Sequence, residues 1–257
     1  MDFNALDARM RVFETAADTC VLPGIYMVAR IDGRSFSHLT RDVLRSKEPF
    51  HLPLRDAMVA ASRAVMDCGF RAVYAHTQSD EISVLLHRDE TLFGRKLRKY
   101  NSILAGEVSA TFSMELGIKG VFDCRICQLP AIENVLDYFR WRQEDAHRNA
   151  LNAHCYWALR NRGQSPADAT ARLKGLSTGD KNQFLFEVLG QNYNDLPRWQ
   201  RRGTGFYWEP YEKPGVNPKT GDATVALRQR LKTDSELPMK EEYASLLRSL
   251  IERSEAR

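Results

Sequence analysis

The sequence lacks any apolar run long enough to cross a membrane, because no segment approaches the ~20 consecutive apolar residues of a membrane helix. It also lacks internal repeats and low-complexity linkers. The first residues, Met1 to Asp7, contain no basic segment followed by an apolar run, so we expect no secretory signal. These absences predict a protein with no membrane partner, and we expect it in the cytoplasm.

Cysteine is scarce and irregularly spaced, with five residues, an odd number. This pattern does not fit a secreted disulfide framework. Cys124 and Cys127 form one C-x-x-C pair, but no second pair completes a zinc site. Both lie in an apolar segment, 121–129, that is typical of a strand. We therefore expect two half-buried small hydrophobic side chains rather than a metal or redox centre.

The 257 residues are enough for one large domain with a full core. The sequence is 43% hydrophobic and 27% charged, which is ordinary for a globular protein. The net charge of +4 is too small to indicate a nucleic-acid partner by itself.

The pattern of apolar residues predicts a mixture of strands and helices without strict alternation, which is the α+β class. Strands are expected at 24–31, 71–77, 81–87, 121–129, 206–208 and 223–231. Helices are expected at 6–17, 53–68, 91–116, 132–160 with a break near 144–147, from Ser165 to Gly175, and at 239–253. Residues 192–203 and 210–220 are expected to form loops. We expect a catalytic core over residues 1–130 and a mainly helical region, 131–257, packed on it.

Acidic residues stand at two predicted strand ends. Asp32 follows the first strand, and Asp80 and Glu81 stand at the turn between the second and third. If these strands are neighbours, the carboxylates converge, and bound divalent cations would relieve their repulsion. Gly33 would let the backbone approach a metal or phosphate, and the following amides would face a triphosphate. Asp-Gly and Ser-Asp-Glu are also ordinary turn sequences, which is the alternative.

Basic residues gather at 95–99, in the first turns of the helix expected to begin near Gly94. Positive charge there opposes the helix dipole, so an anionic ligand such as a triphosphate or RNA would explain it better than local stability. A solvated helix face is the alternative. Two further stretches, 138–142 and 198–202, combine arginine with aromatic residues, and we favour RNA binding for the second only.

Several motifs occur in the order found in one known family: Arg30-Ile31-Asp32-Gly33-Arg34-x-Phe36, Gln78-Ser79-Asp80-Glu81-x-Ser83, Phe93-x-Arg95-Lys96-x-x-Lys99, Phe122-Asp123-x-Arg125, Trp141-Arg142-Gln143-x-Asp145-x-His147, Asp180-Lys181-Asn182, and Asn192-Tyr193-Asn194-x-Leu196-Pro197 leading to Arg202-Gly203-Thr204. On these residues the chain resembles the tRNA(His) guanylyltransferases and the guanylyltransferase-like 3′–5′ polymerases. The resemblance extends from about Asp18 to Trp208.

The resemblance implies a polymerase-palm-like antiparallel sheet flanked by helices, two Mg²⁺ ions and a homotetramer. It also implies that ATP or GTP activates the 5′-phosphate of a tRNA, after which the 3′-hydroxyl of an incoming nucleotide attacks that end.

Site residues follow from the same resemblance. Asp32, the Gly33 carbonyl and Asp80 would hold the metals, with Glu81 supporting them. Nucleotide contacts would come from Gly33, Arg34, Ser35, Phe36, Ser37, Lys47 and Ser79. Contacts with the tRNA or the triphosphate would come from Arg95, Lys96, Lys99, His147, Lys181, Asn194, Arg198 and Arg202.

The stretch from His147 to Ala153 departs from the family pattern. The guanylyltransferases have His-Ile-Asn-Asn-Leu-Tyr-Asn there, and this chain has His-Arg-Asn-Ala-Leu-Asn-Ala. The loss of the tyrosine and the last asparagine favours templated repair of 5′-truncated tRNA. Three alternatives stay open: non-templated G addition to tRNA(His), a palm-type nucleotide cyclase, and an RNA-binding module whose acidic residues only form turns.

Overall fold

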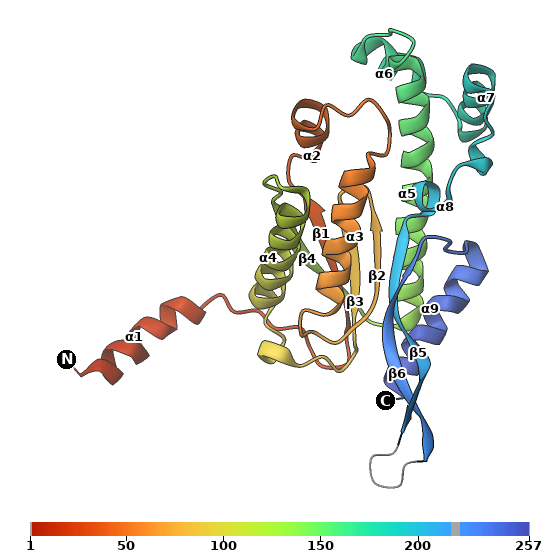
Figure 1. The fold of residues 1–257 in the computed structure, drawn as a ribbon. Helices are drawn as coiled ribbons and strands as arrows, with labels where there is room; N and C mark the ends of the chain where they lie inside the picture. The colour runs from red at the N-terminus through yellow and green to blue at the C-terminus, as the bar shows by residue number, and fades with distance from the viewer. Residues whose placement is uncertain (1, 217–221, 257) are drawn as a thin grey trace.

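The computed structural model describes residues 2–216 and 222–256, and its centre is one antiparallel sheet with helices on both faces (Figure 1). Its six strands lie in the order β4-β1-β3-β2-β5-β6. Their bounds are β1 Tyr26–Gly33, β2 Ala72–Gln78, β3 Glu81–Leu86, β4 Phe122–Leu129, β5 Thr204–Val216 and β6 Ala223–Asp234. This arrangement confirms the α+β class and the antiparallel sheet flanked by helices.

Three hydrophobic cores hold the helices in place. One lies between the sheet and helices α3 and α4; a second lies between the sheet and helices α5 and α9; the third joins α5 to α6 and α7 beyond the sheet. The helix bounds are α1 Phe3–Thr15, α2 Phe36–His38, α3 Leu52–Met66, α4 Leu97–Leu116, α5 Ile132–Arg160, α6 Pro166–Leu173, α7 Thr178–Leu189, α8 Arg198–Arg202 and α9 Lys240–Glu255. Helix α1 extends away from the body with none of its residues buried (Figure 1).

Strand β1 explains how one sheet serves two cores. Met27, Ala29 and Ile31 point into the core under α3 and α4, whereas Tyr26 and Val28 point to α5 and α9. Alternating side chains of a strand face opposite sides, so this pattern confirms the predicted strand.

The same alternation of side chains shows that the C-x-x-C pair is not a metal site. Cys124 packs against the first core and Cys127 against the second, so the two thiols lie on opposite faces of β4 and cannot hold one metal ion. Both are half-buried and free, as predicted. Burial raises the pKa of Cys124 to about 12, which keeps its thiol protonated at neutral pH.

Two helix predictions are wrong. Helix α5 runs without the break expected near 144–147, because Ala146 is buried against the core and Asp145 is held by arginines on the same helix. The helix expected over 91–116 begins only at Leu97. Before it, a 3-10 turn over Leu92–Arg95 contains residues with positive φ that end helical geometry.

The second half contributes two strands to the sheet. Residues 210–216, expected as a loop, continue β5, and residues 217–220 of that expected loop lie outside the described range. Pro210 fits in this strand because, beyond Tyr207, β5 pairs only with β6. Proline is tolerated where its missing N–H faces an unpaired edge. The sheet therefore crosses the expected division near residue 130. Among the described residues, no helix is long and apolar enough to span a membrane.

Gly203, between α8 and β5, provides a test of this packing. Its φ of +77° disfavours any side chain, and a Cβ there would lie 2.3 Å from His76 Nε2 and 2.6 Å from the Thr77 carbonyl oxygen. Gly203→Ala should lower the free energy of unfolding by about 2 kcal/mol or more in urea titration. Gly215→Ala is the control, because only Thr224 Oγ1 lies within 4 Å, at 3.6 Å. Equal stability of the two variants would contradict this packing.

Candidate active site

Pairing of β1 with β3 brings the predicted carboxylates to one edge of the sheet. Asp32 lies directly opposite Glu81 in the antiparallel register. The Gly33 amide donates a hydrogen bond to the Asp80 carbonyl oxygen at 3.0 Å, which fixes the turn beside the strand end. Asp32, Asp80 and Glu81, here called the carboxylate edge, therefore come from two strands that are neighbours in space.

Arginine side chains hold one of these carboxylates. Glu81 lies 2.5 Å from a terminal nitrogen of Arg30 and 2.8 Å from Nε of Arg142. Arg30 also lies 3.3 Å from Asp32, whose second arginine neighbour is Arg125 at 3.5 Å. Burial nevertheless raises the pKa of Glu81, against the effect of the two arginines. Glu81 is thus fixed in place by charged neighbours.

Asp80 has no such cation. Its Oδ1 accepts a hydrogen bond from Ser79 Oγ at 3.0 Å, and in residues 2–216 and 222–256 no basic side chain forms an ion pair with it. Burial raises its pKa, and the nearby Asp32 raises it further. Two neighbouring carboxylates, one of them unpaired, fit a divalent cation that also binds phosphate oxygens. No cluster of three or more metal-binding side chains is found in the described part of the chain.

The carboxylate edge opens into a cleft of about 330 Å³ under α5. Its lining adds Arg142, Asp145, Asn149, Ala150 and Ala153 from that helix. The small alanines leave space facing the carboxylates.

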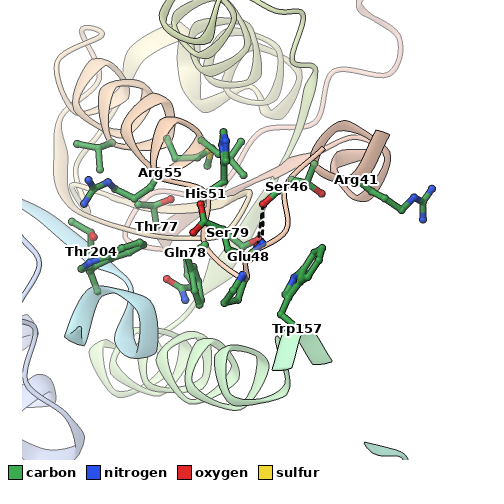
Figure 2. Close-up of a pocket in the computed structure, with 17 residues that line it drawn as sticks. Arg41, Ser46, Glu48, His51, Arg55, Thr77, Gln78, Ser79, Trp157 and Thr204 are labelled. Carbon is green, nitrogen blue, oxygen red and sulfur yellow. Dashed lines mark hydrogen bonds between the residues drawn. The ribbon is translucent and has the colours of Figure 1, made fainter. Parts of the chain in front are cut away.

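A second cleft of about 180 Å³ adjoins the first and has aromatic walls. The two clefts share Phe50, Gln78 and Ser79, so they meet at the tip of the β2–β3 hairpin. Figure 2 shows Trp157 extending from α5 toward the loop that carries Ser46 and Glu48. We call this second space the aromatic cleft.

Trp199 closes the aromatic cleft from α8. The Phe50 ring meets it edge-on at 5.5 Å, and the Arg55 guanidinium lies 4.9 Å from its ring centre. The sequence indicated the basic-aromatic stretch containing Trp199, but we did not predict Phe50, Arg55 or Trp157 as site residues.

The loop after β1 has mixed roles. Arg34, Ser35 and Ser37 are exposed, and Ser35 adopts a left-handed conformation with φ of 61°. The Phe36 ring is only 5% exposed and packs against Phe112 and Phe122, so its predicted role as a nucleotide contact is wrong for the side chain. Gly33 is required here, because a Cβ would lie 2.4 Å from the Phe36 ring.

Lys47 is exposed between Ser46 and Glu48, both of which line the aromatic cleft. Its predicted contact with a nucleotide stays a prediction.

The prediction that Arg95 contacts the tRNA or the triphosphate is wrong. Its side chain is buried, and its guanidinium donates to the carbonyl oxygens of Val21, Arg88, Glu90 and Ile25. These four acceptors occupy its N–H groups, so it anchors the chain near β1 rather than binding RNA or a triphosphate.

Lys96 and Lys99 lie with Arg95 at the Tyr26 end of β1. The other end of the strand carries Asp32, roughly 20 Å away at the usual rise per residue. Lys96 is paired with Asp18 at 2.7 Å. Neither lysine therefore reaches the carboxylate edge of its own chain, and the predicted contacts of Lys96 and Lys99 with the tRNA or the triphosphate stay predictions.

The other predicted contacts surround the helical end of the molecule. His147 packs edge-on against Tyr193 at 5.0 Å, and burial together with Arg201 and Arg202 lowers its pKa. Arg202 donates to the Leu237 carbonyl oxygen, whereas exposed Arg198 pairs with Glu236 at 3.3 Å. Two more of the predicted contact residues lie at the helical end of the molecule. Lys181 is half-buried on α7, and Asn194 is exposed.

Fold and site together define a class: an α+β protein whose palm-like antiparallel sheet presents carboxylates beside an aromatic cleft. A sequence model described as tRNAHis guanylyltransferase matches residues 7–130, and one described as Thg1 C terminal domain matches residues 133–248. The chain belongs to the tRNA(His) guanylyltransferase family, whose members are nucleotidyltransferase enzymes.

Individual relatives agree with this assignment. The probable tRNA(His) guanylyltransferase of Mus musculus is 32% identical over 214 residues, which are 79% of this chain and 71% of the relative. That of Drosophila melanogaster is 33% identical over 196 residues, 73% and 68% of the two chains.

Solved structures agree as well. A bacterial tRNA(His) guanylyltransferase (Thg1)-like protein in complex with ATP matches with a TM-score of 0.75 at 27% identity, covering 97% of this chain and 98% of that one. The tRNA(His) guanylyltransferase of Saccharomyces cerevisiae matches with a TM-score of 0.69 at 26% identity, covering 76% and 90%.

The buried side chain of His76, beside the site, makes the stability of the protein depend on pH. It is 3% exposed, its Nε2 lies 2.8 Å from the Arg202 carbonyl oxygen, and burial lowers its pKa from 6.5 to about 4. Between pH 6.5 and pH 4, His76 binds a proton in the unfolded chain but not in the folded one. Its contribution to the free energy of unfolding is therefore complete above pH 6.5 and is lost as the pH falls toward 4. The loss is on the order of 3 kcal/mol.

Denaturant titrations across this range should show a smaller acid loss in His76→Gln than in the wild type. The exposed His38→Gln is the matched control and should follow the wild type. An identical acid loss in all three proteins would contradict the burial of a neutral His76.

Proposed function

We propose that this protein adds nucleotides in the 3′–5′ direction to the 5′ end of a tRNA, after ATP or GTP has activated the 5′-phosphate. The observation that carries the proposal is the meeting of Asp32 and Asp80 at one sheet edge beside the aromatic cleft. Family membership supports it, as does the bacterial neighbour that was solved with ATP and with GTP.

The aromatic cleft would take the nucleotide base. Phe50, Trp157 and Trp199 offer aromatic surface, and stacking on such rings tolerates different bases. A triphosphate would then pass Ser79, at the junction of the two clefts, toward the carboxylate edge. The exposed amides of Arg34, Ser35 and Ser37, and the Lys47 ammonium, would bind phosphate oxygens.

Asp32, Asp80 and the Gly33 carbonyl are the groups that would hold two Mg²⁺ ions. Ions bound there would activate the attacking hydroxyl and stabilise the leaving phosphate. Glu81 would keep Arg30 and Arg142 in position at the cleft wall, because it forms an ion pair with each of them.

The tRNA would lie along the helical end, where Arg198 and Arg202 accompany Trp199 on α8. His147, Lys181 and Asn194 would contribute further contacts with the tRNA or the triphosphate. A homotetramer, which the family resemblance implies, is part of the same proposal, and the exposed apolar side chains of α1 are available for contacts between copies.

Addition directed by the opposite base is favoured over addition of G alone. Asn149, Ala150 and Ala153 line the cleft within the stretch that departs from the guanylyltransferase pattern. This departure from the guanylyltransferase pattern supports the templated branch.

Asp80→Asn tests the carboxylate edge. The change keeps the side-chain shape but removes the charge that a metal needs, so nucleotide addition should fall by ~100-fold or more. Filter binding should show nearly unchanged tRNA affinity. The matched control is Asp67→Asn, an exposed carboxylate at the end of α3. Wild-type rates in Asp80→Asn would remove the proposed role of this residue.

The templated reaction is tested on a 5′-monophosphorylated tRNA that lacks its first nucleotide, with Mg²⁺, ATP and labelled nucleoside triphosphates. Four substrates that differ only in the base opposite the missing position should each receive the Watson–Crick partner. Addition of G to all four would instead identify non-templated guanylyl transfer.

A further inference from the structure

A cleft opens where β5 leaves the sheet, at the end opposite the carboxylate edge. Strand β5 pairs with β2 only over Thr204–Tyr207 and then continues with β6 alone, as the projecting ribbon in Figure 1 shows. The pairing of β2 with β3 is irregular between Ala72 and Tyr74. The resulting space, the fork cleft, measures about 180 Å³.

Trp208 forms an aromatic wall of the fork cleft. Its side chain is half-buried, and among the residues that the structure describes it has neither an aromatic partner nor a hydrogen-bond partner. Val73 and Leu250, from the core under α5 and α9, add apolar surface to the cleft, whereas Trp208 also packs against the core under α3 and α4. A planar base stacks well on a surface of this kind.

Two unpaired arginines stand at the same cleft. Arg71 and Arg253 are exposed, and neither forms an ion pair within residues 2–216 and 222–256. The nearby Glu90 forms no ion pair with Arg71; its carboxylate oxygens accept the backbone amides of Arg71 and Leu92 at 2.7 Å each. By contrast, Arg248 on the same helix as Arg253 lies 3.6 Å from Glu133. The Arg253 Nε donates to the Ser249 carbonyl oxygen of its own helix at 3.2 Å, and its terminal N–H groups face no carboxylate among the described residues. Two guanidinium groups without an ion pair, beside apolar side chains, fit a phosphate.

His87 holds the end of α9 that carries Arg253. The Asp89 amide donates to His87 Nδ1 at 3.0 Å, so Nδ1 is the acceptor and Nε2 donates to the Ser254 carbonyl oxygen at 3.0 Å. This connection ties the last turn of α9 to the end of β3, and it fixes one arginine of the cleft relative to the sheet.

Lys99 lies at the same end of the sheet as the fork cleft, whereas Lys96 is paired with Asp18. The Lys99 ammonium lies 5.7 Å from the centre of the Phe93 ring, and that ring lies 6.0 Å from Phe70, the residue before Arg71. The lysines that cannot reach the carboxylate edge therefore belong to the same end of the molecule as the unpaired arginines. An extended polyanion explains this grouping better than a small anion does.

We propose that the fork cleft binds one unstacked nucleotide of an RNA, with the base on Trp208 and the phosphate between Arg71 and Arg253. The proposal rests on the proposed function, because the RNA would be the tRNA substrate. The nucleotide would lie about 20 Å from the carboxylate edge, the length of β2. A free mononucleotide offers the same chemistry, and the experiment separates the two sources.

The experiment measures the Kd of full-length protein for a tRNA lacking its first nucleotide, by filter binding over a series of salt concentrations. The double variant Arg71→Ala/Arg253→Ala should raise Kd ~10-fold or more and lower the slope of log K against log salt by about two. Its KM for tRNA should rise in parallel while kcat stays unchanged. The matched control, Arg248→Ala, should behave as the wild type.

Trp208→Ala should raise Kd ~10-fold, and Trp208→Phe should restore binding because it keeps a ring. Trp208 also packs against the core, so Trp208→Ala can fail to fold. In that case the variants of the exposed arginines test the proposal. Equilibrium dialysis with labelled AMP separates the sources. If the double variant loses one equivalent of AMP while its tRNA affinity is unchanged, the RNA assignment is overturned.

Failure of this proposal differs from failure of the proposed function. A wild-type protein that adds no nucleotide to any tRNA refutes the function. An active wild type with the same Kd, KM and salt slope as the double arginine variant refutes the fork cleft.

Discussion

The antiparallel pairing of β1 with β3 is the interaction on which the site depends. It sets Asp32 opposite Glu81, and the Gly33–Asp80 backbone hydrogen bond extends it into the turn. Because side chains alternate along a strand, a register shift of one residue would turn Asp32 into the core under α3 and α4. The buried residues Met27 and Ala29 oppose that shift, since it would remove them from this core and turn the charged Arg30 and Asp32 into it. The apolar core therefore fixes the position of the carboxylates.

Arginines and carboxylates at this edge form a charge arrangement suited to a polyanionic substrate. Arg30 and Arg142 neutralise Glu81, while Asp80 keeps a carboxylate without a cation among the described residues. A half-buried carboxylate without a cation costs free energy, and a bound cation would recover it. On the proposed function, the far end of the same sheet would hold more distant RNA. Nucleotide transfer would then occur at one end of β2 and RNA binding at the other. A substitution at one end could therefore leave the function of the other end unchanged.

The sequence could predict most elements and both acidic turns, since alternation in β1 and the polar hairpin tip are local patterns. It could not predict which strands are neighbours, so the convergence of Asp32 and Asp80 needed the structure. Arg95 was misassigned because a buried arginine bonded to four carbonyl oxygens has the same sequence context as an exposed one. Pro210 suggested a loop, although a strand with one unpaired edge accepts it. The aromatic cleft combines Phe50, Trp157 and Trp199 from distant segments, which no local pattern connects.

The central claim is that Asp32 and Asp80 together hold the metal ions that serve nucleotide transfer. Anomalous diffraction from crystals grown with ATP and Mn²⁺ tests it most directly, because manganese replaces magnesium at oxygen ligands and its position can be measured. The account predicts manganese coordinated by oxygens of both carboxylates, with the triphosphate on the same ions. Bound ATP whose manganese contacts neither Asp32 nor Asp80 would contradict it.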